Sequence, residues 1–146
     1  MVGDGPERLS AVGVAKQLGI SNKVTYLGTI SAIEDLICCA DLIFQPSEHE
    51  SFGLTHLEAM SCKVPVLCTN SGGVTEVVEY GVTGYLADVG DIDTMTKYAI
   101  EILTDEAKAK SMGEKGLERA LAHFDHDVVI QQYVELYEQI IGVVTV

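Results

Sequence analysis

Over the first two thirds of the chain, short runs of apolar residues alternate with longer stretches in which apolar residues recur at helical spacing. The short runs predict buried strands at Val24–Leu27, Leu42–Gln45, Val64–Cys68 and Gly84–Leu86. The longer stretches predict helices at about Glu7–Leu18, Ala32–Ala40, Phe52–Ser61 and Val74–Tyr80. Strands that alternate with helices form parallel sheets with helices on both faces. The pattern therefore predicts an α/β fold on a parallel, Rossmann-like sheet.

The C-terminal third has a different, helical pattern. It predicts three helices, Asp91–Leu103, Asp105–Ala122 and Asp127–Ile141, with no strand between them. In the last one, apolar side chains form a single stripe, made of Val129, Tyr133, Leu136, Tyr137 and Ile140. These helices can cover the sheet, or the last can also reach a second domain.

No Pro/Gly/Ser-rich linker interrupts the pattern, so we expect one domain over residues 1–146. Met1-Val2-Gly3 resembles the tail of a strand that enters the turn Gly3-Asp4-Gly5-Pro6. A doubly wound domain has a whole strand and helix before such a turn. We therefore expect a domain truncated at its N-terminus, with an exposed strand edge that favours a homo-oligomer.

The charge balance of the chain limits the classes of ligand that it can bind. Nine Lys and Arg against 22 Asp and Glu give a formal net charge of -13, which repels a nucleic-acid backbone. A small phosphorylated ligand remains compatible, because backbone amides at a helix start can bind it.

The sequence contains no signal peptide and no apolar run of transmembrane length, so we expect a cytoplasmic protein. The four cysteines show no metal spacing, which predicts reduced, mostly buried thiols.

The segment 46–60 follows the predicted strand Leu42–Gln45 and so lies at a strand's carboxyl end, where open α/β sheets bind ligands. Ser51 is a candidate N-cap. The backbone amides of the next four residues then point out of the first helical turn, where they favour a phosphate or sugar hydroxyls; these residues are Phe52, Gly53, Leu54 and Thr55. Glu50 precedes the helix, and Glu58 lies roughly 10 Å further along it. Carboxylates at both positions can accept hydrogen bonds from vicinal hydroxyls.

Two glutamates eight residues apart are, by themselves, more typical of solvated surface positions. The surrounding residues change this interpretation. The motif Pro46-Ser47…Glu50-Ser51-Phe52-Gly53-Leu54…Leu57-Glu58-Ala59-Met60, with Gly72-Gly73…Glu76-Val77 and Gly81-Val82-Thr83-Gly84 downstream, resembles the group-1 (family 4) retaining glycosyltransferases. The resemblance runs from Val2 to about Tyr137. Within this family the chain looks nearest to the enzymes that join N-acetylglucosamine to L-malate in bacillithiol synthesis.

The resemblance implies the donor-binding C-terminal half of a two-domain GT-B enzyme, with the acceptor domain and the first βα unit absent. Glu50 would contact the donor sugar at the reacting carbon. Ser51, Phe52, Gly53, Leu54 and Thr55 would meet the sugar and distal phosphate, and Glu58 the ribose of a UDP-sugar. The loop of Gly28, Thr29 and Ile30 would lie against the base. The family needs no metal in the chemical step and no cofactor beyond the donor substrate.

Departures from the family pattern matter as well. Lys63 stands where the family has Gly, and Thr75 stands where Pro is common. The family's cations for the departing diphosphate would precede Met1, so we expect this chain alone to be inactive. Two other interpretations stay open: a stand-alone, non-catalytic sugar-nucleotide-binding or interaction module, and a sugar-nucleotide epimerase of similar architecture. His49 and His56 are interpreted as bystanders, because neither has a partner at metal-ligand spacing.

Overall fold

The computed structural model describes residues 1–142. The chain forms two compact units, Met1–Ile33 and Glu34–Val146, and we describe each by itself. The expectation of one domain over residues 1–146 stays a prediction. No helix among the described residues is long and apolar enough to cross a membrane.

The first unit contains the helix α1 (Arg8–Gln17) and a short 3-10 turn, Ser21–Lys23. Residues 1–3 run beside residues 25–28, and three backbone hydrogen bonds of 2.6–2.9 Å join them. The tail of a strand predicted at Met1-Val2-Gly3 thus has a partner. The strand predicted at Val24–Leu27 is not a regular strand, because only this short segment pairs with it in the unit.

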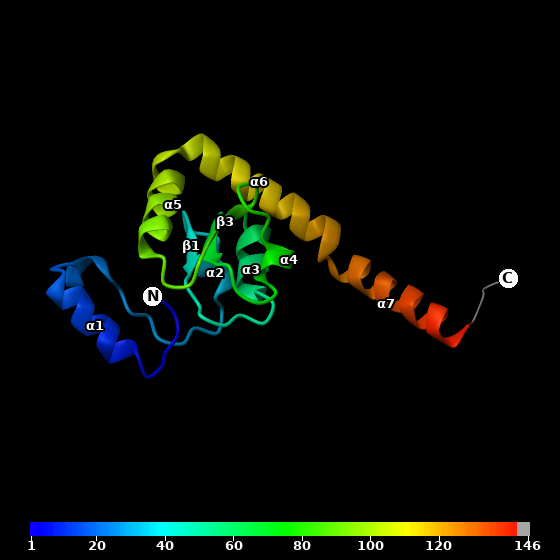
Figure 1. The fold of residues 1–146 in the computed structure, drawn as a ribbon, viewed down its shortest axis with the longest axis horizontal. Coiled ribbons are helices and arrows are strands. Elements are labelled where there is room, and N and C mark those ends of the chain that lie inside the picture. Colours follow the sequence, from blue (N-terminus) through cyan, green and yellow to red (C-terminus); the bar gives the residue numbers. More distant parts are fainter. Residues whose placement is uncertain (143–146) are drawn as a thin grey trace. The chain divides into compact units, whose positions relative to one another are not determined.

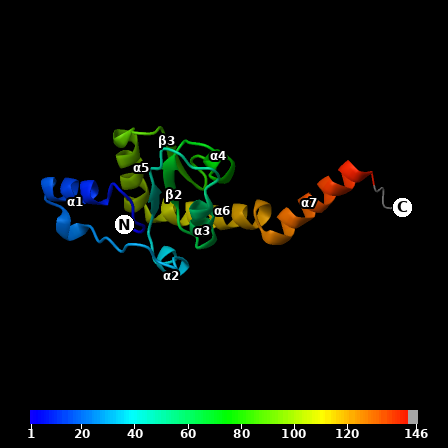
Figure 2. The same cartoon turned by 90° about the horizontal axis from the view of Figure 1, so that it is seen from below.

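The second unit is built on a parallel sheet of three strands, β1 (Ile43–Gln45), β2 (Val66–Thr69) and β3 (Gly84–Ala87), in the order β1-β2-β3. The short helix α2 (Glu34–Ile37) precedes β1, and the short helices α3 (Leu54–Ser61) and α4 (Val74–Val77) lie between successive strands in the sequence. Three longer helices follow the sheet, namely α5 (Ile92–Thr104), α6 (Glu106–His123) and α7 (His126–Ile141). Figures 1 and 2 show α5 on one face of the sheet and α3 on the other.

The central strand β2 is the most buried part of this unit. All four of its residues are at most 1% exposed, as expected for a parallel strand covered on both faces. On one face Leu67 packs with Tyr85, Ile102 and Met112, which joins β2 and β3 to α5 and α6. Burying a large apolar side chain stabilises the fold by about 1.5–3 kcal/mol, so this cluster anchors the two long helices to the sheet.

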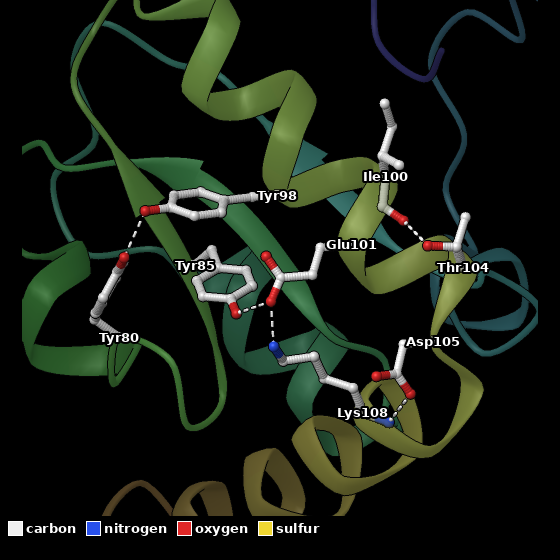
Figure 3. A network of polar contacts seen from close by, with 8 residues as sticks. All are labelled: Tyr80, Tyr85, Tyr98, Ile100, Glu101, Thr104, Asp105 and Lys108. Carbon is white, nitrogen blue, oxygen red and sulfur yellow. Dashed lines mark hydrogen bonds and ion pairs between the residues drawn. The ribbon is translucent and has the colours of Figure 1, made fainter.

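A network of polar contacts reinforces that anchor at its rim (Figure 3). The Tyr85 hydroxyl donates to Glu101 at 2.7 Å, and the Lys108 ammonium pairs with the same carboxylate. This ion pair lowers the pKa of Glu101 and raises the pKa of Lys108. The Tyr98 ring stacks on Tyr85 with centroids 4.2 Å apart, and its hydroxyl meets that of Tyr80. Side chains from α5, α6 and the β3 region are therefore fixed to one another.

The helix α7 does not cover the sheet. In Figures 1 and 2 it continues beyond α6, away from the strands, and none of its described residues is buried. Its apolar stripe is open to solvent, with Tyr133 57%, Tyr137 61% and Ile140 70% exposed. The interpretation that all three C-terminal helices cover the sheet is therefore wrong for this one.

The outer edge of β1 is also open in the described unit, because β1 is the end strand of the sheet. Phe44 on this strand is 52% exposed. A groove of about 560 Å³ lies between this strand and α5, lined by Phe44, Ile92, Met95, Ile100 and Leu103 among others. The exposed strand edge expected from a truncated N-terminus stays a prediction.

The cysteines differ from the expectation of four reduced thiols. Cys38, just after α2, forms a disulfide with Cys62 at the end of α3, where their Cα atoms lie 5.0 Å apart. Cys39 is exposed, and Cys68 alone is a buried thiol; burial raises its pKa to about 12. The bridge follows from the packing of α2 against α3, which a separation of 24 residues did not reveal.

The helix α3 ends in a Schellman motif that requires a left-handed residue at Lys63. The amide of Val64 donates to the carbonyl of Ala59 at 2.9 Å, and the amide of Lys63 donates to Met60 at 3.0 Å. Lys63 has φ 58, the one positive φ among non-glycine residues of the described chain. This conformation explains physically why the family pattern has Gly at the position.

Replacing Lys63 by glycine should therefore stabilise the protein. Lys63→Gly removes the strain of a side chain in the left-handed region, and we expect the free energy of unfolding to rise by about 1 kcal/mol. Urea unfolding followed by circular dichroism measures this change. Lys63→Ala is the matched control, because it removes the same charge but keeps a Cβ. An equal rise in both variants would contradict the explanation.

Candidate functional site

Two loops meet at the carboxyl edge of the second unit's sheet. The strands β1 and β2 are parallel neighbours with Gln45 opposite Cys68. The segment 46–53 leaves the end of β1, and the segment 70–73 leaves the end of β2. Because parallel strands end at the same edge, both loops lie where open α/β sheets bind ligands.

The start of α3 lies two residues later than the sequence predicted. Gly53, not Ser51, occupies the N-cap position, with φ 103 and ψ 47, and no side chain caps the helix. The predicted N-cap was wrong because Gly53 adopts a left-handed conformation that turns the chain after Phe52, whereas Ser51 is left in the loop. Ser51 is exposed and its hydroxyl makes no hydrogen bond in the described chain.

The altered helix start leaves three amides free instead of the predicted four, because Phe52 lies before the N-cap and its amide approaches Oε1 of Glu50 at 3.5 Å. Within the described chain, the backbone amides of Gly53, Leu54 and Thr55 donate no hydrogen bond, while the next amide, His56, donates to the Gly53 carbonyl at 3.0 Å. Leu54 is 67% exposed, Thr55 is half-buried and Gly53 is buried, so the turn is open to solvent at Leu54. Free amides and the positive end of the helix dipole together favour an anion or hydroxyl acceptors.

The loop after β2 holds the loop after β1 in place. The Thr69 hydroxyl donates to the carbonyl of Ser47, and the Ser71 hydroxyl donates to the carbonyl of Glu48 at 2.9 Å. Two glycines then pack directly on the backbone beyond. A Cβ on Gly72 would lie 1.8 Å from the Glu50 carbonyl oxygen, and one on Gly73 would lie 2.5 Å from that of Ser51. The Gly72-Gly73 pair therefore fixes the backbone of Glu50 and Ser51.

Two contacts orient the Glu50 carboxylate, one from the end of β1 and one from its own loop. Gln45, the last residue of β1, donates from Nε2 to Oε2 of Glu50 at 3.0 Å, and the Phe52 amide approaches Oε1 at 3.5 Å. The Phe52 ring packs edge-on against Phe124 at the end of α6, with centroids 5.9 Å apart. Glu50 is half-buried, so its charge sits in a defined place beside the free amides.

Glu58 lies on the same helix, one turn beyond Leu54. Both side chains are exposed, whereas Thr55 is half-buried. Glu50, the free amides and Glu58 thus lie on one short stretch of chain, and their roles in binding a donor stay predictions. Glu58 makes no hydrogen bond or ion pair in the described chain, so its carboxylate is free to meet a ligand.

His56, which was interpreted from the sequence as a bystander, is a buried polar residue of this region. It is 1% exposed, and neither ring nitrogen has a hydrogen-bond partner in the described chain. Burial lowers the pKa of His56, and the nearby Glu50 charge and Gly53 backbone only partly oppose this effect. Its position three residues after Gly53 was the only signal in the sequence.

The sign of that pKa shift links His56 to stability. The folded state binds the imidazole proton less readily than the unfolded chain does. Stability is therefore complete above the ordinary imidazole value of 6.5 and is lost as the pH falls from there through the lowered value.

The remaining predicted site residues belong to the other compact unit of the chain. Gly28, Thr29 and Ile30 belong to the first unit, where Gly28 has φ 68 and its carbonyl accepts from Gly3 at 2.8 Å. Their role in contacting a base stays a prediction. Across residues 1–142, no group of three or more His, Cys, Asp or Glu side chains is placed to hold a metal ion.

Comparison with known proteins identifies the relatives of this chain. Residues 1–119 match the family described as "Glycosyl transferases group 1". The chain is 39% identical over 141 residues to N-acetyl-alpha-D-glucosaminyl L-malate synthase of Bacillus anthracis, which covers 97% of this chain and 37% of that protein. It is 32% identical over 139 residues to 2-deoxystreptamine N-acetyl-D-glucosaminyltransferase of Niallia circulans, covering 92% and 35% of the two chains. The predicted resemblance is confirmed.

Solved structures give the same result for the fold. Anabaena Alr3699/HepE in complex with UDP aligns with a TM-score of 0.86 at 29% identity, covering 94% of this chain and 40% of that chain. Sucrose-phosphate synthase from Thermosynechococcus elongatus aligns with a TM-score of 0.85 at 29% identity, covering 98% and 38%. The predicted Rossmann-like fold of a GT-B C-terminal domain is confirmed. The chain spans little more than a third of the length of these relatives.

A methyl group at Gly72 should disrupt the contact that fixes the Glu50 loop. Gly72→Ala places its Cβ against the Glu50 carbonyl and adds strain at φ 60; we expect the free energy of unfolding to fall by about 2–4 kcal/mol. Gly81→Ala is the control, because Gly81 has φ 75 but nothing within 4 Å of an added Cβ. The control should lose about 1 kcal/mol. Equal losses in urea unfolding would show that the close contact contributes nothing.

Proposed function

Because this chain belongs to the group-1 glycosyl transferases, we propose that it binds a nucleotide-activated sugar, specifically a UDP-sugar, as the donor domain of a retaining glycosyltransferase. The observation that carries this proposal is the set of free amides at Gly53, Leu54 and Thr55, held between the Glu50 and Glu58 carboxylates. One relative, Anabaena Alr3699/HepE, is named for its complex with UDP-glucose, which supports the same ligand class.

The diphosphate of the donor occupies the first turn of α3 in this proposal. Amides and the helix dipole can bind an anion there without a fixed positive charge. This matters in a chain with a formal net charge of -13, because bulk attraction for an anion is absent. The amides would therefore determine both the position and the orientation of the diphosphate.

Glu50 lies beside the reacting carbon of the sugar. Transfer with retention passes through a transition state with oxocarbenium character, which a nearby carboxylate stabilises. Gln45 donates to one oxygen of Glu50 and leaves the other close to the Phe52 amide, so the carboxylate would be oriented before the donor binds. The proposed chemical step uses no metal ion.

Glu58 binds the ribose of the donor. Its exposed carboxylate is placed to accept hydrogen bonds from two vicinal hydroxyls, about one turn along α3 from the free amides. In the same proposal the loop of Gly28, Thr29 and Ile30 meets the base.

An acceptor domain outside this chain completes the enzyme. The chain spans 37% of the N-acetyl-alpha-D-glucosaminyl L-malate synthase it resembles, which leaves room for a whole further domain in such a protein. We propose that this domain carries the acceptor site and that the chain by itself does not transfer sugar. A cytoplasmic location and a homo-oligomer stay predictions.

Replacing Glu58 should weaken donor binding without affecting the fold. We expect Glu58→Ala to reduce the affinity for UDP by about 1–3 kcal/mol, because charged hydrogen bonds to the ribose are lost. Isothermal titration calorimetry with UDP and UDP-N-acetylglucosamine measures the change. Glu114→Ala, which removes an exposed glutamate from α6, should bind like the wild type. Equal binding by both variants would remove Glu58 from the site.

The chain alone should not transfer sugar. With UDP-N-acetylglucosamine and L-malate as substrates, we expect no glycoside product and no UDP release above the rate without protein, because one wall of the cleft is outside this chain. Mass spectrometry of the reaction mixture measures both products. Turnover would overturn the proposal that a further domain is required, whereas the donor-binding assay would be unaffected.

A further inference from the structure

His56 has an environment that its fold alone does not explain. The ring is 1% exposed and neither nitrogen has a partner in the described chain. A buried polar group without a hydrogen bond destabilises the folded state, so such groups are rare and call for an explanation. An apolar side chain would fill the same space on α3 without this penalty.

The His56 ring lies next to Gly53, the N-cap residue of α3. A Cβ added to Gly53 would lie 2.4 Å from Nδ1 of His56. The imidazole nitrogen therefore faces Gly53, a buried residue whose amide, like those of Leu54 and Thr55, donates no hydrogen bond in the described chain. The ring therefore lies against the residue at which the proposed anion site begins.

The charges around His56 are few. Glu50 is the titratable group whose charge acts on it. The elements packed on α3 are β2, α2, α4 and α6. β2 brings the neutral thiol of Cys68. The charged side chains of the helices include Glu34 and Asp35 of α2, Glu76 of α4, and Lys110, Lys115 and Arg119 of α6, and none of them is a cause of the lowered pKa of His56. In the sequence, no Lys or Arg occurs between Lys23 and Lys63, nor between Lys63 and Lys97. The two loops of the site thus contain no fixed positive charge.

We propose that His56 is a proton-linked positioning residue of the donor site, neutral in the free protein and protonated when a diphosphate binds to the amides of Gly53, Leu54 and Thr55. This inference rests on the proposed function. The negative charge of the diphosphate, acting through a poorly solvated region, favours the imidazolium. One proton passes from solvent to a ring nitrogen, and no covalent bond between heavy atoms changes.

The protonated ring would then donate hydrogen bonds to two neighbouring groups. Its N–H groups gain acceptors in the Glu50 carboxylate and the Gly53 backbone, the two groups that already favour its charged form. The cation thereby draws Glu50 and the N-cap together while the diphosphate is bound. Donor affinity becomes linked to pH because the bound state holds one more proton than the free state.

The test is calorimetry with UDP-glucose, whose diphosphate diester does not titrate between about pH 5 and 8. For the wild type at pH 6.5, the binding enthalpy should vary with the ionisation enthalpy of the buffer, showing proton uptake. The affinity should rise by about threefold to tenfold from pH 8 to pH 6, since one linked proton gives at most tenfold per pH unit. His56→Gln should bind without proton uptake and without this pH dependence.

The exposed His49 supplies the matched control. His49→Gln should retain the proton uptake and pH dependence of the wild type. Equal proton uptake by wild type and His56→Gln would overturn the inference and leave the proposed donor site intact. Absence of UDP-glucose binding at every pH would overturn the donor site itself, and the inference with it.

A second measurement does not depend on a variant that folds. Titration of the wild-type imidazole signals by NMR should show the His56 resonance moving to a higher apparent pKa when UDP-glucose is added. A His56 resonance that titrates identically with and without bound UDP-glucose would overturn the proposal.

Discussion

The close contact of Gly72 with the carbonyl of Glu50 is the constraint on which the site depends. A side chain at Gly72 would occupy the position of that oxygen. Only with this contact can the loop after β1 lie flat against the loop after β2, where Thr69 and Ser71 donate to it. The orientation of Glu50, the turn at Gly53 and the free amides of α3 all follow from the path that this contact permits.

The scaffold beneath the loops is rigid for a different reason. The strand β2 is buried on both faces, and the long helices α5 and α6 are tied to β3 by Tyr85 and its partners (Figure 3). Close backbone contacts also occur where α6 crosses the end of α3: a Cβ on Gly113 would lie 1.9 Å from the Lys63 carbonyl. The helix that carries the free amides is thus held at both ends by glycine contacts.

The sequence predicted the sheet of the second unit well. Short apolar and β-branched runs such as Val66–Thr69 are typical of buried strands, so their pattern indicates the structure directly. The helix α3 was predicted to begin too early because its apolar periodicity includes Phe52, whereas its start is determined by the left-handed conformation of Gly53. The disulfide between Cys38 and Cys62 and the buried state of His56 were missed for a shared reason. Both depend on how α3 packs, which no local pattern reports.

Apart from Gly28, Thr29 and Ile30, the candidate site residues lie in one short stretch of the sequence, and their roles stay predictions. Glu50 and Glu58 owe their spacing to the helix between them, and their roles came from the resemblance of the surrounding motif. The residues that hold the stretch in shape, Ser71 and Gly72, lie some twenty residues later and carry no chemistry of their own. Residues that position a site in this way leave a weaker trace in a sequence than those that touch a ligand.

The hydrogen bonds from Thr69 and Ser71 to the loop after β1 have a consequence for the order in which the chain acquires its shape. During synthesis Ser47 and Glu48 emerge before the residues that bond to their carbonyls, which follow 22 and 23 positions later. A nascent chain that ends before Gly73 has the glutamates of the motif but not the backbone that orients them. The loop after β1 thus acquires its final conformation only with the following βα unit, after β2 has paired with β1.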